Sequence, residues 1–205
     1  GPQAPASGRK GKARATSFLT EYVDHLLAQV DLAALPPMRI LADVGNGAAG
    51  HVLAEIERRF SAAKVPAGFR IVNARPDGRF PNGVPNPLLP ERRARTIAAV
   101  REQGADIGIA WDGDFDRCFF FDADGRYVSG YYITGLLMAH FLENRPASRF
   151  VLDCRLNWNS RDILQKGGGI GVPSRTGHRF FKEVMRREGA IYGGEVSAHH
   201  YFESF

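Results

Sequence analysis

The sequence has 205 residues, few cysteines and no long apolar run. Its cysteines, Cys118 and Cys154, lie in separate apolar stretches without a CxxC spacing. This pattern excludes a disulfide framework or a cysteine zinc site and predicts two reduced thiols in the core. Because there is no stretch of about 18 apolar residues and no apolar leader, the sequence supports neither a membrane partner nor export. We therefore expect a cytoplasmic protein.

Excess charge of one sign is also missing from most of the chain. The net charge is +5, but Arg9, Lys10, Lys12 and Arg14 lie in an acid-free opening, and the rest has 23 basic and 22 acidic residues. We predict that residues 1–16 form a disordered linker or an appended remnant, with a polyanion-binding arm as the alternative. No nucleic-acid partner is expected for the folded part.

Segments typical of helices and strands alternate along the rest of the chain. Phe18, Tyr22, Leu26 and Val30 have the spacing of one helical stripe. Proline interrupts the segment 75–90, which predicts a loop. Strands are expected at 39–44, 69–74, 105–111, 117–129 around an Asp-Gly turn, 149–154, 169–174 and 190–194, and helices at 51–60, 91–104, 130–145, 159–167 and 177–187.

This alternation predicts an α/β fold with largely parallel sheets and helices on both faces. The pattern begins a second cycle near residue 130, which indicates two consecutive three-layer units. Because ligands of such folds bind at the carboxyl ends of strands, chemistry is expected in the loops after residues 111, 154 and 194.

A glycine motif follows the first of these strands. Gly45, Gly47 and Gly50 match the G-x-G-x-x-G pattern of dinucleotide sites. The acidic residue that should end the second strand is absent, since Asn73 stands there and Asp77 comes only in the loop. We therefore interpret the glycines as allowing a tight turn and close helix packing.

Three aspartates follow the strand 105–111 at every second position. Asp112, Asp114 and Asp116 would project to one side if the chain stayed extended. Such a carboxylate cluster favours a divalent cation, and oxygen ligands suit Mg²⁺, Ca²⁺ or Mn²⁺ rather than zinc. An EF-hand is excluded, because Arg117 and Ala123 occupy the positions that need glycine and glutamate. The alternative is a solvated acidic turn.

Two features indicate an anionic ligand. Arg117 beside the acidic cluster suits a phosphoryl group, and metal plus arginine is typical of phosphoryl transfer. Thr176 or Gly177 would cap a helix that begins with His178 and Arg179, so a phosphate would fit there. Taken alone, this histidine could also be a cap or a surface residue.

The segment "GGEVSAHHYF" follows the last strand. Glu195 could accept hydrogen bonds from neighbouring sugar hydroxyls, and Ser197 could donate to them or accept from them. The same segment could also be only a turn.

Together these segments resemble the α-D-phosphohexomutases, most closely the bacterial phosphomannomutases that supply GDP-mannose synthesis. The motifs are "DGDFDR", "TGHRFFKE", "GEVSAHHYF", "GNGAAG" and "FPNGVPNPLLPE". The resemblance implies the family's second domain at residues 17–126 and its third domain, truncated at the C-terminus, at residues 127–205.

The resemblance implies a phosphomannomutase that interconverts mannose 6-phosphate and mannose 1-phosphate through a phosphoserine and a hexose 1,6-bisphosphate. It implies Mg²⁺ as cofactor and a hexose phosphate as substrate. A guanidinium with a pKa above about 12 is a poor proton shuttle, so we assign Arg155 to charge stabilisation and His178 to acid or base chemistry. The implied ligands are Asp112, Asp114 and Asp116 for the metal, Arg117 for the phosphoryl group, and Arg155, Arg175, His178, Glu195 and Ser197 for the substrate.

The sequence also departs from the family. No serine is followed by His-Asn-Pro, as the family's phosphoryl-carrying serine is, and no segment resembles its first or fourth domain. We therefore expect weak Mg²⁺ binding and no turnover by this chain alone. One alternative is a haloacid-dehalogenase-type phosphatase, with Asp112 as nucleophile and Asp114 as acid or base. The other is a non-catalytic module that binds metal or sugar phosphate.

Overall fold

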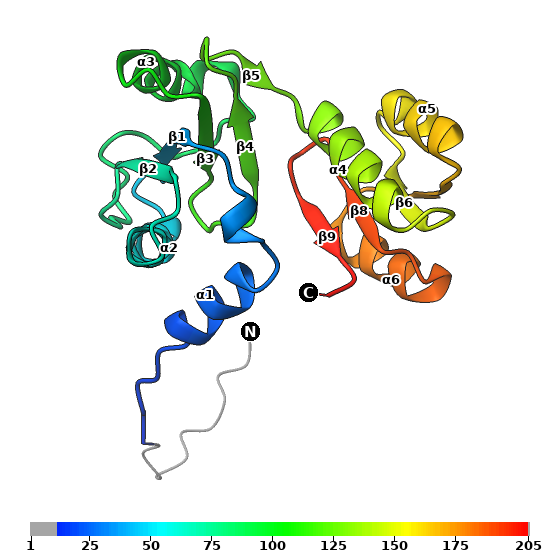
Figure 1. The fold of residues 1–205 in the computed structure, drawn as a ribbon, viewed down its shortest axis with the longest axis horizontal. Helices are drawn as coiled ribbons and strands as arrows, with labels where there is room; N and C mark the ends of the chain where they lie inside the picture. The colour runs from blue at the N-terminus through cyan, green and yellow to red at the C-terminus, as the bar shows by residue number, and fades with distance from the viewer. Residues whose placement is uncertain (1–11, 205) are drawn as a thin grey trace, which may run out of the picture.

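The computed structural model describes residues 12–204 and contains two sheets flanked by helices (Figure 1). Residues 1–11 of the predicted tail lie outside this range, and residues 12–18 have no regular structure. The first sheet has the order β2-β1-β3-β4-β5 and the second the order β7-β6-β8-β9. The strands are β1 (Met38–Asp43), β2 (Ala67–Val72), β3 (Ile107–Trp111), β4 (Cys118–Phe121), β5 (Tyr127–Val128), β6 (Arg149–Asp153), β7 (Ile170–Ser174), β8 (Tyr192–Gly194) and β9 (His200–Phe202).

Three neighbouring strands at one side of each sheet run parallel, β2-β1-β3 in the first and β7-β6-β8 in the second, and the other strands pair antiparallel with their neighbours. The α/β fold with mixed, largely parallel sheets is therefore confirmed. Within the described residues, no helix is long and apolar enough to cross a membrane. The helices are α1 (Leu19–Leu27), α2 (Ala49–Ala62), α3 (Ala94–Glu102), α4 (Gly130–Asn144), α5 (Trp158–Gly167) and α6 (His178–Glu188), with short 3-10 turns η1 (Leu32–Ala34) and η2 (Pro90–Arg92).

Alternating side chains of β6 show how the second sheet is buried. Phe150 and Leu152 pack with Leu164 of α5 on one face, and Val151 packs with Phe181 of α6 on the other. Successive strand residues point to opposite faces, so a strand buried on both sides reads as a continuous apolar run. The carboxyl ends of β6 and β8 are consequently fixed between two helical layers.

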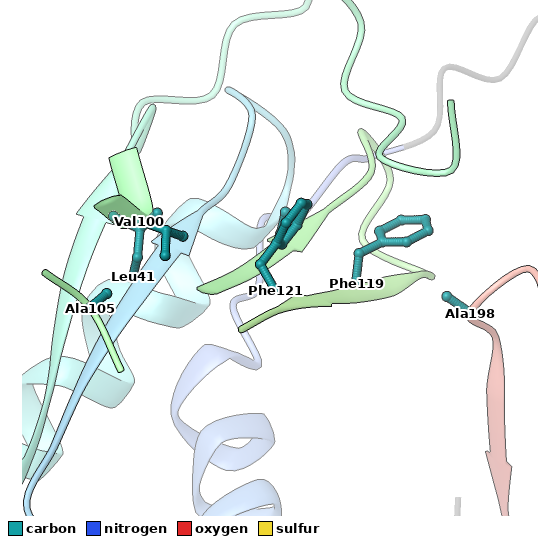
Figure 2. Packing of buried hydrophobic residues seen from close by; sticks show 7 residues of the cluster. Leu41, Val100, Ala105, Phe119, Phe121 and Ala198 are labelled. Atoms are coloured by element: carbon teal, nitrogen blue, oxygen red, sulfur yellow. The ribbon is translucent and has the colours of Figure 1, made fainter. Parts of the chain in front are cut away.

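The two sheets meet where the loop after β8 reaches β4. Ala198 is only 2% exposed and joins the core of the first sheet beside Phe119 (Figure 2). The backbone N–H of Cys118 also donates to the Ala198 carbonyl at 3.3 Å. This contact places the loop between β8 and β9 next to the loop between β3 and β4.

The helix predicted after the tail is confirmed as α1, but most of the stripe that indicated it is exposed. Phe18 is 69% exposed, Tyr22 41% and Val30 47%, whereas Val23 is fully buried. Helix α1 ends at Leu27, before Val30, and contacts α2. A short helix lying on the rim of a domain buries a narrow strip, which spacing alone did not locate.

The two cysteines are free thiols in different environments. Burial raises the pKa of Cys118 to about 12, which fits the predicted core position. Cys154 is exposed just after β6, so the prediction of a core thiol is wrong there. The apolar run of β6 ends at Asp153, and the chain has already left the core at the next residue.

Candidate active site

The three aspartates lie on a turn after β3. The chain does not stay extended beyond Trp111, because the Phe115 N–H donates to the Asp112 carbonyl at 3.3 Å and Phe115 has a φ of 70°. The left-handed residue reverses the chain within the motif. One carboxylate oxygen each from Asp112, Asp114 and Asp116 nevertheless lies within 4.8 Å of the others. The turn therefore gathers the predicted ligands by a different route.

Asp112 forms the buried base of this turn. It is 1% exposed, and Arg117 bonds both of its oxygens, with the backbone N–H at 3.1 Å from Oδ1 and Nε at 2.5 Å from Oδ2. The Arg117 guanidinium also donates to Asn86 Oδ1 at 3.4 Å. A buried carboxylate needs such a partner to offset its desolvation. This arrangement disfavours the phosphatase alternative, which needs Asp112 as a free nucleophile.

The donor set fits Mg²⁺. All three ligand atoms are carboxylate oxygens, and Asp114 and Asp116 are exposed. Mg²⁺ prefers oxygen ligands, takes few of them from protein and keeps positions for water or phosphate oxygens. A buried anchor with two accessible carboxylates leaves room for such outer ligands.

Glu195 follows β8 and is 1% exposed. Its Oε1 accepts the Gly177 N–H at 2.9 Å, and its Oε2 lies 2.9 Å from both the Tyr201 hydroxyl and His199 Nδ1. Burial by itself raises the pKa of Glu195, but the hydrogen bonds from His199, Gly177 and Tyr201 outweigh burial and hold that pKa below its usual value. Glu195 is therefore an ionised acceptor near neutral pH.

Arg155 lies beside this loop and is held by Asp153, a residue that the sequence interpretation missed. Asp153 Oδ2 accepts Arg155 Nη2 at 2.5 Å and the Val196 N–H at 3.1 Å. The same Nη2 lies 3.5 Å from Ser197 Oγ and 3.6 Å from Glu195 Oε1. Burial acts to raise the pKa of Asp153, but these hydrogen bonds lower it overall. The sequence feature that could have identified Asp153 is its position at the end of the apolar strand "FVLD".

His199 connects the two loops and was also missed. Its Nε2 lies 3.3 Å from Asp116 Oδ2, and its Nδ1 lies 3.1 Å from Ser197 Oγ. The hydrogen bond to Glu195 raises the pKa of His199, burial lowers it, and the charge of Asp116 raises it further. The sequence feature that could have identified His199 is its position in the segment "GGEVSAHHYF", two residues after Ser197.

A cavity of about 1070 Å³ opens beside these groups. Asp116 from the metal loop, Glu195, Ser197 and His199 from the loop after β8, and His178 from the start of α6 all line it. The structure thus brings together, around one space, side chains from both sheets. Its volume lies near the upper end of the range that small-molecule sites commonly have, about 300–1,000 Å³.

The start of α6 partly matches the prediction. Gly177 is the N-cap, with a φ of 117°, while Thr176 Oγ1 lies 3.3 Å from Asp153 Oδ1 instead of capping the helix. Arg175, itself within the described chain, is not one of the residues that line the cavity. Its guanidinium lies 4.1 Å above the Phe180 ring.

Two family models match the chain in succession. They are described as phosphoglucomutase/phosphomannomutase alpha/beta/alpha domain II, over residues 20–125, and domain III, over residues 129–205. The chain belongs to this phosphohexomutase family. A phosphomannomutase of Escherichia coli is 56% identical over 205 residues, which is 100% of this chain and 44% of that protein. One of Vibrio cholerae is 53% identical over 96% of this chain and 42% of its own length.

Solved structures of phosphohexomutases share the fold. A phosphoglucomutase/phosphomannomutase family protein of Burkholderia thailandensis superposes with a TM-score of 0.82 at 29% identity, covering 91% of this chain and 39% of that one. A putative phosphomannomutase of Thermus thermophilus gives 0.84 at 19% identity, covering 96% and 45%. The family resemblance is confirmed, and the chain spans less than half the length of the relatives that it matches.

Proposed function

We propose that this chain carries the metal-binding and sugar-binding half of a phosphomannomutase and does not turn over substrate alone. The full reaction interconverts mannose 6-phosphate and mannose 1-phosphate through a phosphoserine and a hexose 1,6-bisphosphate. The observation that carries the proposal is the single cavity shared by Asp116, at the edge of the acidic cluster, and by Glu195, Ser197 and His178. Relatives at more than 50% identity are named phosphomannomutase.

Asp112, Asp114 and Asp116 would hold Mg²⁺, with Asp112 as the buried anchor. When bound there, Mg²⁺ supplies neutralisation of the charge that develops on a transferred phosphoryl group. Arg117 keeps the anchor in place through its Nε. The Arg117 N–H groups that Asp112 and Asn86 do not accept would donate to a phosphoryl oxygen.

The sugar is proposed to sit against the loop after β8. Glu195, held ionised, accepts hydrogen bonds from sugar hydroxyls, and Ser197 accepts or donates. Arg155 stabilises negative charge beside them. His178 stays our proposed acid or base, and His199 joins it as a second candidate because its imidazole lies between Asp116 and Glu195. The phosphoserine would come from the part of the relatives that this chain does not span.

The proposal is tested by binding and turnover measurements on the purified chain. Titration calorimetry with mannose 1-phosphate in the presence of Mg²⁺ should detect binding, and Glu195→Gln should weaken it about tenfold, as loss of a charged hydrogen-bonding partner does. Glu183→Gln is the control, because Glu183 pairs with Arg179 on the exposed face of α6. Equal affinities of the Glu195→Gln variant and the wild type would refute the sugar-binding role. Interconversion of the two mannose phosphates by the chain alone would refute the requirement for a serine from elsewhere.

A further inference from the structure

The backbone of the metal loop is pressed against the glycine turn that follows β1. The Ala48 N–H donates to the Gly113 carbonyl at 3.0 Å. A Cβ built on Gly47 would lie 2.8 Å from that carbonyl oxygen and 3.2 Å from the Asp112 carbonyl oxygen. Gly113 separates Asp112 from Asp114, so this contact is made at the centre of the ligand set.

Gly47 is needed for space rather than for an unusual backbone conformation. Its φ lies outside the left-handed region, whereas its neighbour Gly45 has a φ of 57°. An alanine at position 47 would therefore meet no backbone penalty of its own. The three atoms that its Cβ would meet most closely all belong to the backbone of the metal loop, which would have to move.

The proline-studded loop forms the opposite wall. A Cβ on Gly113 would lie 3.1 Å from Cζ of Phe80 and 3.9 Å from Cγ of Pro85. Asn86 of the same loop accepts from Arg117, which in turn holds Asp112. The metal loop is thus confined on two sides by segments that supply no metal ligand of their own.

Several hydrogen bonds join the glycine turn to the proline-studded loop, among them Asp77 N–H to the Asn46 carbonyl at 2.9 Å. Asn82 Nδ2 donates to Asn46 Oδ1 at 3.0 Å and to Asn73 Oδ1 at 2.9 Å. Asn73 Nδ2 donates in turn to the buried Asp43 at 2.8 Å. Asn46 and Asn73 have φ values of 59° and 53°, a conformation that asparagine tolerates better than most residues. This network fixes the glycine turn relative to the proline-studded loop.

We propose that Gly47 is a positioning residue of the metal site. It lets the glycine turn approach the metal loop closely enough to set the direction of the Asp112 and Asp114 carboxylates. The inference rests on the proposed function in assuming a cation at these aspartates. It gives a role to the G-x-G-x-x-G match, which serves here to support a neighbouring loop rather than to bind a dinucleotide.

The test compares Gly47→Ala with Gly68→Ala, because a Cβ on Gly68 meets nothing within 4 Å and its φ is also ordinary. Mn²⁺ affinity is measured by electron paramagnetic resonance, and the amide signals of residues 112–117 are followed by NMR without metal. We expect Gly47→Ala to weaken Mn²⁺ binding about tenfold or more, as loss of outer support does at metal sites, and to shift the loop amides. Gly68→Ala should match the wild type in both.

Each other result decides the inference. The inference is overturned if Gly47→Ala binds Mn²⁺ as tightly as the wild type. This holds even if the variant has a lower melting temperature, because a loss of stability alone would show that Gly47 has only a structural role. If the wild-type protein binds no Mn²⁺, the proposed metal site is refuted. The amide signals of residues 112–117 without metal then decide whether Gly47 positions the loop: a shift in Gly47→Ala supports this role, and unchanged signals overturn it. If Gly47→Ala does not fold, Asn82→Ala decides: about threefold weaker Mn²⁺ binding supports the inference, and unchanged binding overturns it.

Discussion

Asp153→Asn should destabilise the protein strongly although it changes no shape. Asp153 is 3% exposed and accepts from the Arg155 side chain and from the Val196 N–H on Oδ2. An asparagine keeps one carbonyl oxygen but turns a donor toward donors, and it leaves Arg155 with the more distant Glu195 carboxylate, at 3.6 Å, in place of Asp153. Because the Arg155 side chain is 44% exposed, solvent screens part of the loss, and the change should cost about 2–3 kcal/mol, between the costs of losing an exposed and a buried pair. For a chain of this size, that is a fall in melting temperature of about 5–10 °C.

The control for this change is Asp162→Asn. Asp162 pairs with Lys166 at 2.8 Å, but both side chains are largely exposed, at 60% and 75%. Exposed pairs at this helical spacing contribute about 0.3–0.5 kcal/mol, so the control should unfold within about 1 °C of the wild type. Thermal unfolding followed by circular dichroism at pH 7 compares the three proteins.

The effect of Asp153→Asn should depend on pH in one direction. The folded-state pKa of Asp153 is lowered, so its contribution is fully present above the unfolded-state pKa, near 4, and is lost as pH falls through the folded-state value. The stability difference between wild type and variant should be constant from about pH 5 to pH 8 and shrink below about pH 4. A difference under about 1 kcal/mol at pH 7, or one that grows on acidification, would refute the reasoning.

Three further predictions follow from single side chains. Burial and the charge of neighbouring His199 lower the pKa of His200 to about 4. As the pH falls from 6.5 to 4, the free energy of unfolding should therefore fall by up to about 1.4 kcal/mol per pH unit. His200→Gln should flatten this dependence in urea titrations. Phe119→Ala empties the core beside Ala198, which should cost about 3–5 kcal/mol by the same titration. Arg155→Lys loses the planar fork that Asp153 holds and its Nη2 contact with Ser197, so mannose 1-phosphate affinity should fall about threefold or more by calorimetry, with thermal unfolding as the control.

The order of helices and strands could be predicted from the sequence because buried strands and amphipathic helices each carry their own period. What periodicity cannot give is the extent of burial at an edge. Helix α1 shows this, since Val23 is buried instead of the expected stripe of Phe18, Tyr22 and Val30. Strand β9 escaped notice because its three residues are too few for a pattern.

The acidic cluster could be predicted, but not its geometry. The sequence places Asp112, Asp114 and Asp116 together, whereas the left-handed Phe115 that turns the loop is a bulky residue with no local signal for that conformation. His199 was missed for another reason. Its contact with Asp116 joins residues more than 80 positions apart, and it depends on how the two sheets meet.

Paramagnetic broadening by Mn²⁺ tests the central claim most directly, namely that one cation at the acidic loop lies beside the sugar-binding loop. In the NMR spectrum of the wild-type chain, substoichiometric Mn²⁺ should broaden the amides of residues 112–117 and of residues 195–199 together, because Asp116 and His199 are 3.3 Å apart. The exposed turn at Asp122 and Asp124 should broaden less. Broadening centred on that turn, or of residues 112–117 without 195–199, would contradict the account.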